Sequence, residues 1–439
     1  MSYRNPLKLS GIAAAAVLFS AAAAQGAGFA IIENSASGMG SAYASGGAAA
    51  EDAGTVWFNP ASMTQIRGVS LVASMNYISP RADFTNDGST FADGSPLTGP
   101  DSHGGMDAVV PTFYATGQVN EQLFLGLSIN SPFGLGTKYD DNWVGRYHAV
   151  ETDLVTVNVN PAVAYKINDK WSVGAGISVQ YVYVKLTSAI DFGSLMGSPG
   201  TADGFGDLDG DNADDLSFGW NVGVLYTLDE NTRFSVAYRS KISHHVTGDA
   251  DFTVPASAAP IVSTGLFKDT TLSSDVDMPA SASFSVFHRA GRFDLMGDVL
   301  WTQWSLFQEL RIKYDNPVQP DSVTTENYQD QWRFAVGGRY HVDDTLLLRA
   351  GLAYDGKAVK NRHYRTPRIP DNDRTWVSLG LGYRFSELFG MDVGYSHLFV
   401  AKTPIDNEYE SGADPLKHRL KGDFDSSVDI LSVQLTMNF

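Results

Sequence analysis

Apolar and polar residues alternate one by one along many segments of the chain, most clearly at the C-terminus. In the last nine residues, LSVQLTMNF, Leu431 and every second residue up to Phe439 are apolar, and the residues between them are polar. The segment 171–181, WSVGAGISVQY, alternates in the same way. A period of two is typical of a β-strand, because successive side chains point to opposite faces. Segments of about ten residues also match the length of a strand that crosses a membrane.

The connections between such segments alternate strictly between short turns and long loops. The short turns lie near Asn120, Asn168, Asp229, Ala290, Asp343 and Ser386. Short periplasmic turns and long external loops are typical of bacterial outer-membrane barrels. We therefore predict an all-β fold, a 14-stranded antiparallel transmembrane β-barrel with both ends of the wall on the periplasmic side. The expected strands are 66–79, 109–119, 122–131, 151–167, 170–190, 215–228, 231–247, 271–289, 292–315, 326–341, 345–355, 374–385, 388–402 and 424–439.

A soluble β-sandwich is the structural alternative, and it does not require this strict alternation of loop lengths. Aromatic residues near the tight-turn ends, such as Trp171, Tyr226 and Tyr340, fit the girdle that outer-membrane barrels place at the membrane interface. Part of this enrichment follows from the ordinary preference of aromatic residues for strands.

The N-terminus has the organisation of a secretory signal peptide. Arg4 and Lys8 precede the apolar run GIAAAAVLFSAAAA, and small residues, Ala24 and Gly26, occupy the −3 and −1 positions of a cleavage site. We predict residues 1–26 as the signal peptide of a Gram-negative outer-membrane protein, with an uncleaved anchor helix as the alternative. Its removal would make the net charge of −18 two units more negative. An acidic chain of this kind is not expected to bind nucleic acid.

The mature chain begins with a segment that shows no lasting alternation. Residues 27–65 are rich in Gly, Ala and Ser, and they are too few to form a domain with its own core. A barrel of this width needs contents in its lumen or becomes a water channel. We predict that residues 27–65 form an N-terminal hatch, or plug, inside the barrel of residues 66–439. A solvated periplasmic tail is the alternative, but the apolar Val56, Trp57 and Phe58 argue against it.

An ordered set of motifs along the mature chain resembles the FadL/TodX family of outer-membrane transporters for long-chain fatty acids and other hydrophobic compounds. SASGMGSAY, DAG and NPA resemble the family's hatch, and SPFGLGTKY resembles its third external loop. GWNVGVLYTLDENTRFSVAYRS and WTQWSLFQEL resemble barrel segments. The resemblance implies capture of a ligand in a groove between external loops, transfer to a lumenal pocket beside the hatch, and sideways exit near a kink in the third strand.

The resemblance also implies roles for individual residues. Pro132, Phe133 and Leu135 match the external-loop motif and would line the groove, although a purely structural turn is the alternative. Phe29 matches the aromatic residue near the mature start and would touch the inner ligand, with plain packing as the alternative. The hatch turn, Asn59, Pro60 and Ala61, would act in gating.

A fatty-acid head group requires a cation or hydrogen-bond donors in the pocket. Arg311 is the first candidate, because it lies on a polar face and matches a basic residue of the family. The alternation changes phase after Thr302, which predicts a bulge or a strand above the bilayer. Lys185 is the second candidate, but strict alternation from Trp171 turns it outward. A cation at the rim that faces lipopolysaccharide is the alternative for both.

Other chemistry is weakly represented in the sequence. The acidic stretch DGFGDLDGDNADD spaces Asp207, Asp209 and Asp211 like a calcium loop, but the Gly and the terminal Glu of an EF-hand are missing. We expect no cofactor and no metal; the stretch is only a weak calcium candidate, and a solvated acidic loop tip is the alternative. Cysteine is absent, and no G-x-S-x-G motif occurs, so we expect no enzyme activity.

The expected function is passive uptake of a fatty acid or another hydrophobic molecule by a monomer surrounded by outer-membrane lipid and lipopolysaccharide. A general or anion-selective diffusion porin is the first alternative, and a surface adhesin is the second. The sequence leaves open whether the substrate is a fatty acid, an aromatic hydrocarbon or an alkane.

Overall fold

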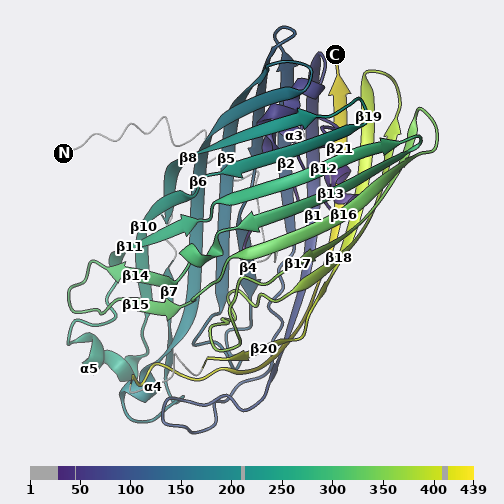
Figure 1. Ribbon diagram of the computed structural model, residues 1–439. Helices are drawn as coiled ribbons and strands as arrows, with labels where there is room; N and C mark the ends of the chain where they lie inside the picture. Colours follow the sequence, from purple (N-terminus) through teal and green to yellow (C-terminus); the bar gives the residue numbers. More distant parts are fainter. Residues whose placement is uncertain (1–27, 45, 209–212, 408–413) are drawn as a thin grey trace, which may run out of the picture.

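Antiparallel strands form one closed sheet around a lumen (Figure 1). The computed structural model describes residues 28–44, 46–208, 213–407 and 414–439, so the expected signal peptide and its cleavage site lie outside the described residues. The sheet closes where β1 (Val69–Asn86) pairs with β21 (Lys421–Asn438). The all-β barrel class predicted from the alternation is confirmed.

The expected count of fourteen strands is wrong, because the wall is a closed 16-strand barrel. The expected strands 231–247 and 271–289 are each interrupted. Residues 240–241 separate β9 from β10, and residues 279–280 separate β11 from β12. The wall consists of β1, β2 (Ala108–Gln118), β3 (Leu123–Asn130), β5 (Glu151–Lys166), β6 (Trp171–Asp191), β8 (Asp214–Thr227), β9 (Thr232–Arg239), β10 (Ile242–Thr253), β11 (Thr270–Met278), β12 (Ser281–Ala290), β13 (Phe293–Thr302), β16 (Gln331–His341), β17 (Leu346–Asp355), β18 (Arg374–Arg384), β19 (Phe389–Val400) and β21.

Both interruptions have a local chemical cause. Pro279 has no backbone N–H and cannot donate to a sheet ladder, so it ends β11. Ser240 replaces a ladder bond with its side chain, because its hydroxyl accepts a hydrogen bond from the backbone N–H of Trp220 at 2.9 Å. Hydrophobic alternation alone does not reveal such breaks, because the apolar pattern continues across them.

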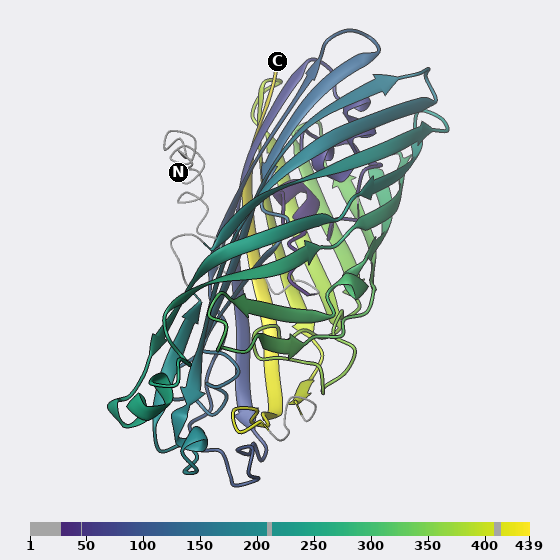
Figure 2. The same ribbon diagram turned by 90° about the vertical axis from the view of Figure 1, so that its left-hand side faces the viewer.

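Within the described residues, five further strands belong to the long connections. They are β4 (Gly134–Lys138), β7 (Asp203–Leu208), β14 (Glu309–Tyr314), β15 (Ser322–Thr325) and β20 (Thr403–Asp406). The helices α4 (Phe192–Leu195), η2 (Ala256–Ala258), α5 (Ala259–Val262) and η3 (Trp304–Leu306) also lie in these connections. Figures 1 and 2 place α4, α5 and β20 at the end of the barrel opposite the C-terminus, whereas short hairpin turns gather at the C-terminal end. We call these the long-loop end and the short-turn end.

The apolar face of the wall strands points away from the lumen. Leu431 and Leu435 are 46% and 41% exposed, whereas Ser432 and Gln434 between them are fully buried. A water-soluble sheet would show the opposite arrangement, with its apolar side chains inside. The outward apolar face therefore fits a barrel surrounded by lipid.

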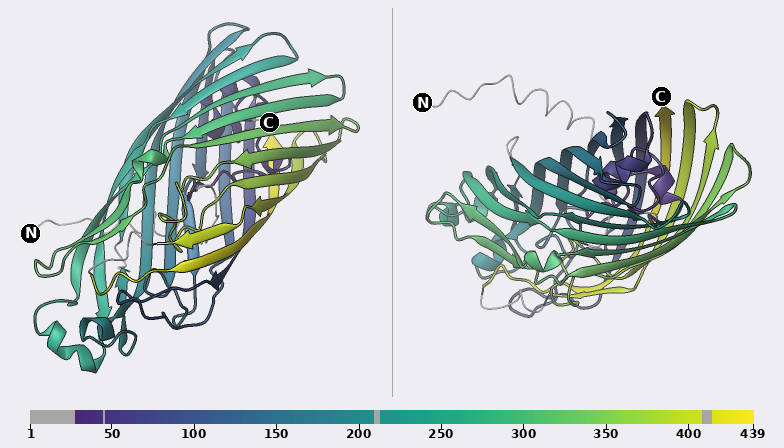
Figure 3. Two further views of the ribbon diagram at one scale, coloured as in Figure 1. Left: turned by 60° about the horizontal axis from the view of Figure 1, so that its bottom comes forward. Right: turned by 45° about the horizontal axis from the view of Figure 1, so that its top comes forward.

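The segment 28–66 lies inside the ring of strands, nearer the short-turn end (Figure 3). It contains three short helices, α2 (Ala36–Met39), α3 (Thr55–Phe58) and η1 (Pro60–Gln65). Its small residues allow close approach to the wall. A Cβ atom added to Gly351 of β17, for example, would lie 2.2 Å from the carbonyl carbon of Ser41.

No helix in the described part of the chain combines the length and the apolar character needed to cross a membrane.

Candidate ligand-binding and gating site

An aromatic cluster surrounds the start of the lumenal segment. Phe29 is 1% exposed, and its ring centroid lies 4.6 Å from that of Trp304 and 5.6 Å from that of Phe307. Phe133 lies 6.2 Å from Phe29 in an edge-to-face arrangement, and Leu135 belongs to the same buried cluster. The structure therefore brings Phe29 together with Phe133 and Leu135, which lie more than 100 positions later in the sequence.

The chain after β3 separates from β2, remains bonded to β5 and also pairs with the lumenal segment. The N–H of Ile31 donates to the carbonyl of Pro132 at 2.8 Å, and the N–H of Gly134 donates to the carbonyl of Phe29 at 2.9 Å. The register between β2 and β3 covers only residues 113–118 of β2, so residues 108–112 have no partner in β3.

Asn34 of the lumenal segment lies beside this interruption of the wall. The Thr112 hydroxyl donates to the carbonyl of Asn34 at 2.9 Å, and the Asn130 amide donates to its side-chain oxygen at 3.1 Å. The lumenal segment therefore contacts the wall at the point where the β2–β3 ladder ends.

A cavity of about 130 Å³ lies between the lumenal segment and the wall strands β8, β9, β12 and β13. Typical ligand pockets enclose roughly 300–1,000 Å³, so a long acyl chain fits only after side chains or the segment move. The lining consists of Ala30, Ile31, Ile32, Tyr43, Gly46, Trp57, Phe58, Pro60, Pro132, Phe133, Asn221, Val222, Ala237, Tyr238, Arg239, Pro279, Ser281, Ser283, Asp298, Leu300 and Thr302.

Arg239 of β9 is the one basic residue in this lining. Its guanidinium lies 3.5 Å from the centroid of the Trp57 ring and donates to the carbonyl of Trp57 at 2.8 Å. It also donates to the hydroxyl of Ser178 at 3.1 Å. Within the described residues Arg239 forms no ion pair, so its charge is available to an anionic ligand.

The turn Asn59-Pro60-Ala61 joins the lumenal segment to the wall. The fully buried Asn59 accepts from the N–H of Ala61 at 2.9 Å, and so caps η1. Its amide donates to the carbonyl of Val224 at 3.0 Å and to the hydroxyl of Ser235 at 2.7 Å. These acceptors belong to β8 and β9, so Asn59 spans two wall strands.

Two wall glycines make room for this turn. A Cβ atom on Gly223 would lie 1.8 Å from the side-chain oxygen of Asn59. One on Gly174 would lie 2.4 Å from the backbone nitrogen of Ala61. The turn therefore contacts the backbone of β6 and β8 directly.

The lumenal segment also carries two buried carboxyl groups. Glu33 is 1% exposed, and burial, with a smaller contribution from Asp355, raises its pKa to about 7. Burial and the neighbouring Glu51 raise the pKa of Asp52, which accepts hydrogen bonds from Ser37 at 2.7 Å and Gln434 at 2.8 Å.

Comparison with known proteins places this arrangement in a family. A family model described as outer membrane protein transport protein (OMPP1/FadL/TodX) matches residues 17–439. A long-chain fatty acid transport protein of Escherichia coli O6:H1 is 33% identical over 427 residues, covering 92% of this chain and 93% of that protein. The chain belongs to the FadL/TodX family of outer-membrane transport proteins.

Other FadL/TodX relatives agree with this assignment. Outer membrane protein P1 of Haemophilus influenzae is 30% identical over 425 residues and covers 88% of each chain. A crystal structure of a Pseudomonas aeruginosa FadL homologue superposes with a TM-score of 0.86 at 28% identity, covering 94% of this chain and 100% of that one. The Pseudomonas putida toluene transporter TodX shares the fold. It superposes with a TM-score of 0.65 at 17% identity, covering 87% of this chain and 92% of its own. The predicted outer-membrane location and the transport function are confirmed.

The structure places neither of the two cations expected from the sequence at the cavity of this FadL/TodX protein. Arg311 lies on β14 and pairs with Glu309 at 2.7 Å and with Asp321 at 3.1 Å. Lys185 lies on β6, 3.7 Å from Glu151. The expected change of phase after Thr302 corresponds to residues 303–308, beyond which β14 pairs with β15 and, at two positions, with β11 of the wall.

The acidic stretch is only partly described. Asp207 lies on β7, whereas Asp209 and Asp211 lie outside the described residues.

Arg239 and Glu51 are not among the site residues expected from the sequence. The signal for Arg239 is the alternation of β9, because Ser235 and Ala237 face the lumen and Arg239 continues their face. Glu51 stands out as the first acid after a run of small residues, GGAAA, but only the fold shows what it contacts.

Proposed function

We propose that this protein takes up long-chain fatty acids, with the ligand carboxylate bound by Arg239. The observation that carries the proposal is a guanidinium without an ion pair in a largely apolar lumenal cavity. A charge-assisted hydrogen bond from such a group is worth roughly 1.5–3 kcal/mol. The fatty-acid transport protein of E. coli O6:H1 supports this choice of substrate class, because it matches along nearly the whole chain.

The proposed path begins at the long-loop end, where Pro132, Phe133 and Leu135 form part of the capture groove. The acyl chain then displaces Phe29 from its aromatic cluster and enters the cavity beside Trp57. Residues 27–65 act as the hatch of the barrel formed by residues 66–439, after removal of the signal peptide 1–26. Asn59, Pro60 and Ala61 hold the hatch against the wall.

The proposed exit is sideways, through the wall between β2 and β3. The unpaired register of β2 residues 108–112 supports this route, since fewer ladder bonds must break there. Asn34 lies beside the opening, so movement of the hatch N-terminus controls access to it.

In this proposal the protein works as a monomer and has no catalytic activity. Its apolar outer face contacts outer-membrane lipid. Outward charged groups on the β10–β11 side, such as Lys241 with Asp277 and His245 with Asp275, are placed to meet lipopolysaccharide head groups.

Substitution of Arg239 tests the choice of ligand. Uptake of labelled oleate and of toluene is measured in a deletion strain that carries Arg239→Gln, with Arg311→Gln as the matched control. We expect oleate uptake to fall about 10-fold or more in Arg239→Gln and toluene uptake to stay within about twofold. Arg311→Gln leaves both unchanged, because its charge is neutralised outside the cavity.

The proposal fails if Arg239→Gln reduces the uptake of oleate and of toluene equally while the variant protein is present in the outer membrane at its normal abundance. That result would show that Arg239 supports Trp57 and the hatch rather than the carboxylate.

A further inference from the structure

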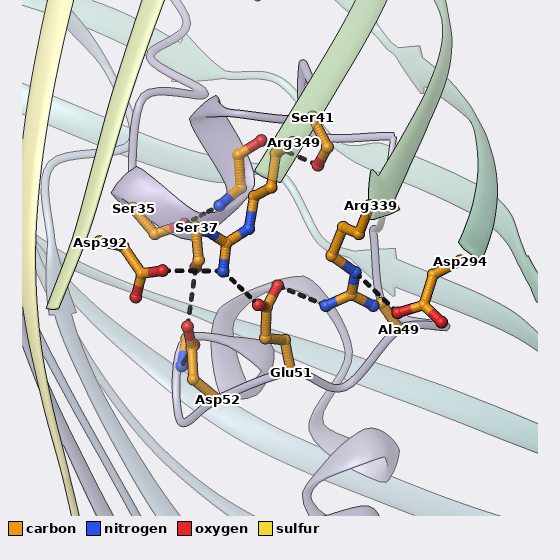
Figure 4. Close-up of polar contacts among 12 residues, drawn as sticks. Ser35, Ser37, Ser41, Ala49, Glu51, Asp52, Asp294, Arg339, Arg349 and Asp392 are labelled. Atoms are coloured by element: carbon orange, nitrogen blue, oxygen red, sulfur yellow. Dashed lines mark hydrogen bonds and ion pairs between the residues drawn. The ribbon is translucent and has the colours of Figure 1, made fainter. Parts of the chain in front are cut away.

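A second group of contacts joins the hatch to the wall, away from the cavity of the proposed function. Glu51 of the lumenal segment lies between two wall arginines (Figure 4). Its carboxylate is 2.6 Å from Arg339 of β16 and 2.5 Å from Arg349 of β17. Both arginine side chains are at most 5% exposed. Although burial opposes ionisation, Arg339 and Arg349 lower the pKa of Glu51, so its carboxylate is charged.

Each of these arginines also contacts a carboxylate of the wall itself. Arg349 lies 2.8 Å from Asp392 of β19, and Arg339 lies 3.2 Å from Asp294 of β13. Asp294 in turn lies 2.7 Å from Arg289 of β12. The wall partners therefore hold the arginines in place, and Glu51 joins the hatch directly to both of them.

A polar cavity of about 290 Å³ lies next to Glu51 at the short-turn end. Its lining includes Asp343 and Ser386 of two short turns, as well as Glu51, Arg349 and Asp392. The side chain of Glu51 is 23% exposed, which places the carboxylate at the boundary of this space. The short-turn end is periplasmic in outer-membrane barrels, so the cavity is a vestibule on the periplasmic side.

The vestibule and the apolar cavity share no lining residue. The two are therefore separate spaces inside one barrel, and the hatch lines both, with Gly46 at the apolar cavity and Glu51 at the vestibule. The ion pairs of Glu51 hold the hatch against the wall at the edge of the vestibule.

We propose that Glu51 is an electrostatic latch that keeps the hatch closed over a water-filled passage between the lumen and the periplasm, and that its release lets small ions through. Removing one partner from a buried ion pair leaves the other charges uncompensated, so the closed state loses stability. The ion passage is separate from fatty-acid uptake, and it does not depend on the role proposed for Arg239.

Single-channel recording in planar bilayers tests the latch with the purified full-length protein. Glu51→Gln removes the charge with little change in shape, and we expect openings to become roughly 100-fold more frequent than in the parent protein. Glu51→Asp, which keeps the charge, is the matched control and is expected to open far less often than Glu51→Gln.

A reversible cross-link distinguishes a moving hatch from a damaged wall. The chain has no cysteine, and the N–H of Ala48 donates to the hydroxyl of Ser285 in β12 at 3.0 Å. Ala48→Cys and Ser285→Cys are therefore added to Glu51→Gln, and formation of the disulfide is verified by mass spectrometry. We expect oxidation to suppress the openings and reduction to restore them.

Either of two results overturns the proposal. One is a Glu51→Gln protein whose currents equal those of the parent. The other is a Glu51→Gln current that persists when the cross-link has formed. Neither result bears on oleate uptake through Arg239, so the latch and the proposed function fail independently.

Discussion

The contact between Asn59 and Gly223 gives a sharp test of how the hatch is held. Alanine at position 223 would place its Cβ atom 1.8 Å from the Asn59 side-chain oxygen, so the Asn59 side chain must leave its site. The matched control is Gly117→Ala in β2, because no atom lies within 4 Å of the added Cβ atom. Both changes replace a wall glycine by alanine, and only one meets the hatch.

The expected magnitude follows from the bonds of Asn59. Displacement removes its hydrogen bonds to Val224 at 3.0 Å and Ser235 at 2.7 Å, together with the η1 cap at Ala61. Each bond contributes about 0.5–1.5 kcal/mol and a cap about 1 kcal/mol, so the docked hatch loses about 2–4 kcal/mol. At 1.4 kcal/mol for each factor of ten, this is a rise of about 30- to 700-fold in the local opening equilibrium.

Hydrogen exchange of the amides in 61–65 measures this opening, with the wall amides of β21 as an internal reference. We expect faster exchange of the hatch amides in Gly223→Ala and parent-like exchange in Gly117→Ala. In an Asn59→Ala background, Gly223→Ala should have almost no further effect, because its target is gone. Equal exchange in the two glycine variants, or full additivity with Asn59→Ala, would refute this account.

Two further tests concern Glu33 of the hatch and the proposed exit between β2 and β3. Burial raises the pKa of Glu33 from 4.5 to about 7, so between pH 4.5 and pH 7 Glu33 is protonated in the folded hatch but ionised in the unfolded chain. The stability that this proton gives the docked hatch is present at low pH and is lost as the pH rises through about 7. In Glu33→Gln we expect this pH-dependent loss of stability, up to about 3 kcal/mol, to be absent. Hydrogen exchange of the hatch amides at pH 5 and pH 8, corrected for intrinsic exchange rates, measures the difference. A Glu33→Gln protein with the same pH dependence as the parent would contradict this expectation. Thr112→Trp should fill the β2–β3 opening and slow the uptake of oleate and of toluene alike. The control Val109→Trp places its side chain on the outer face and should leave uptake unchanged. Equal uptake by the two variants would rule out this exit.

Several parts of the site were predictable because they follow from local chemistry. Asn59, Pro60 and Ala61 were expected to form a turn of the hatch, and the structure shows Asn59 as both a helix cap and a wall contact. The aromatic Phe29 and the loop residue Phe133 were each singled out, and they lie in one cluster. The choice of cation was not predictable, because Arg239 and Arg311 both lie on polar faces of strands. Only the surrounding chain shows that Arg311 is paired outside the cavity.

The sequence by itself determined the barrel, its membrane location and its family. Alternation with a period of two depends only on neighbouring residues, and the lengths of turns and loops are written directly along the chain. The tertiary structure alone decided the number of wall strands, the cation at the cavity and the partners of Glu51. These depend on strand breaks and on contacts between residues hundreds of positions apart, such as Glu51 and Arg349. Such contacts exist only after the sheet has closed around the hatch, so no local pattern encodes them.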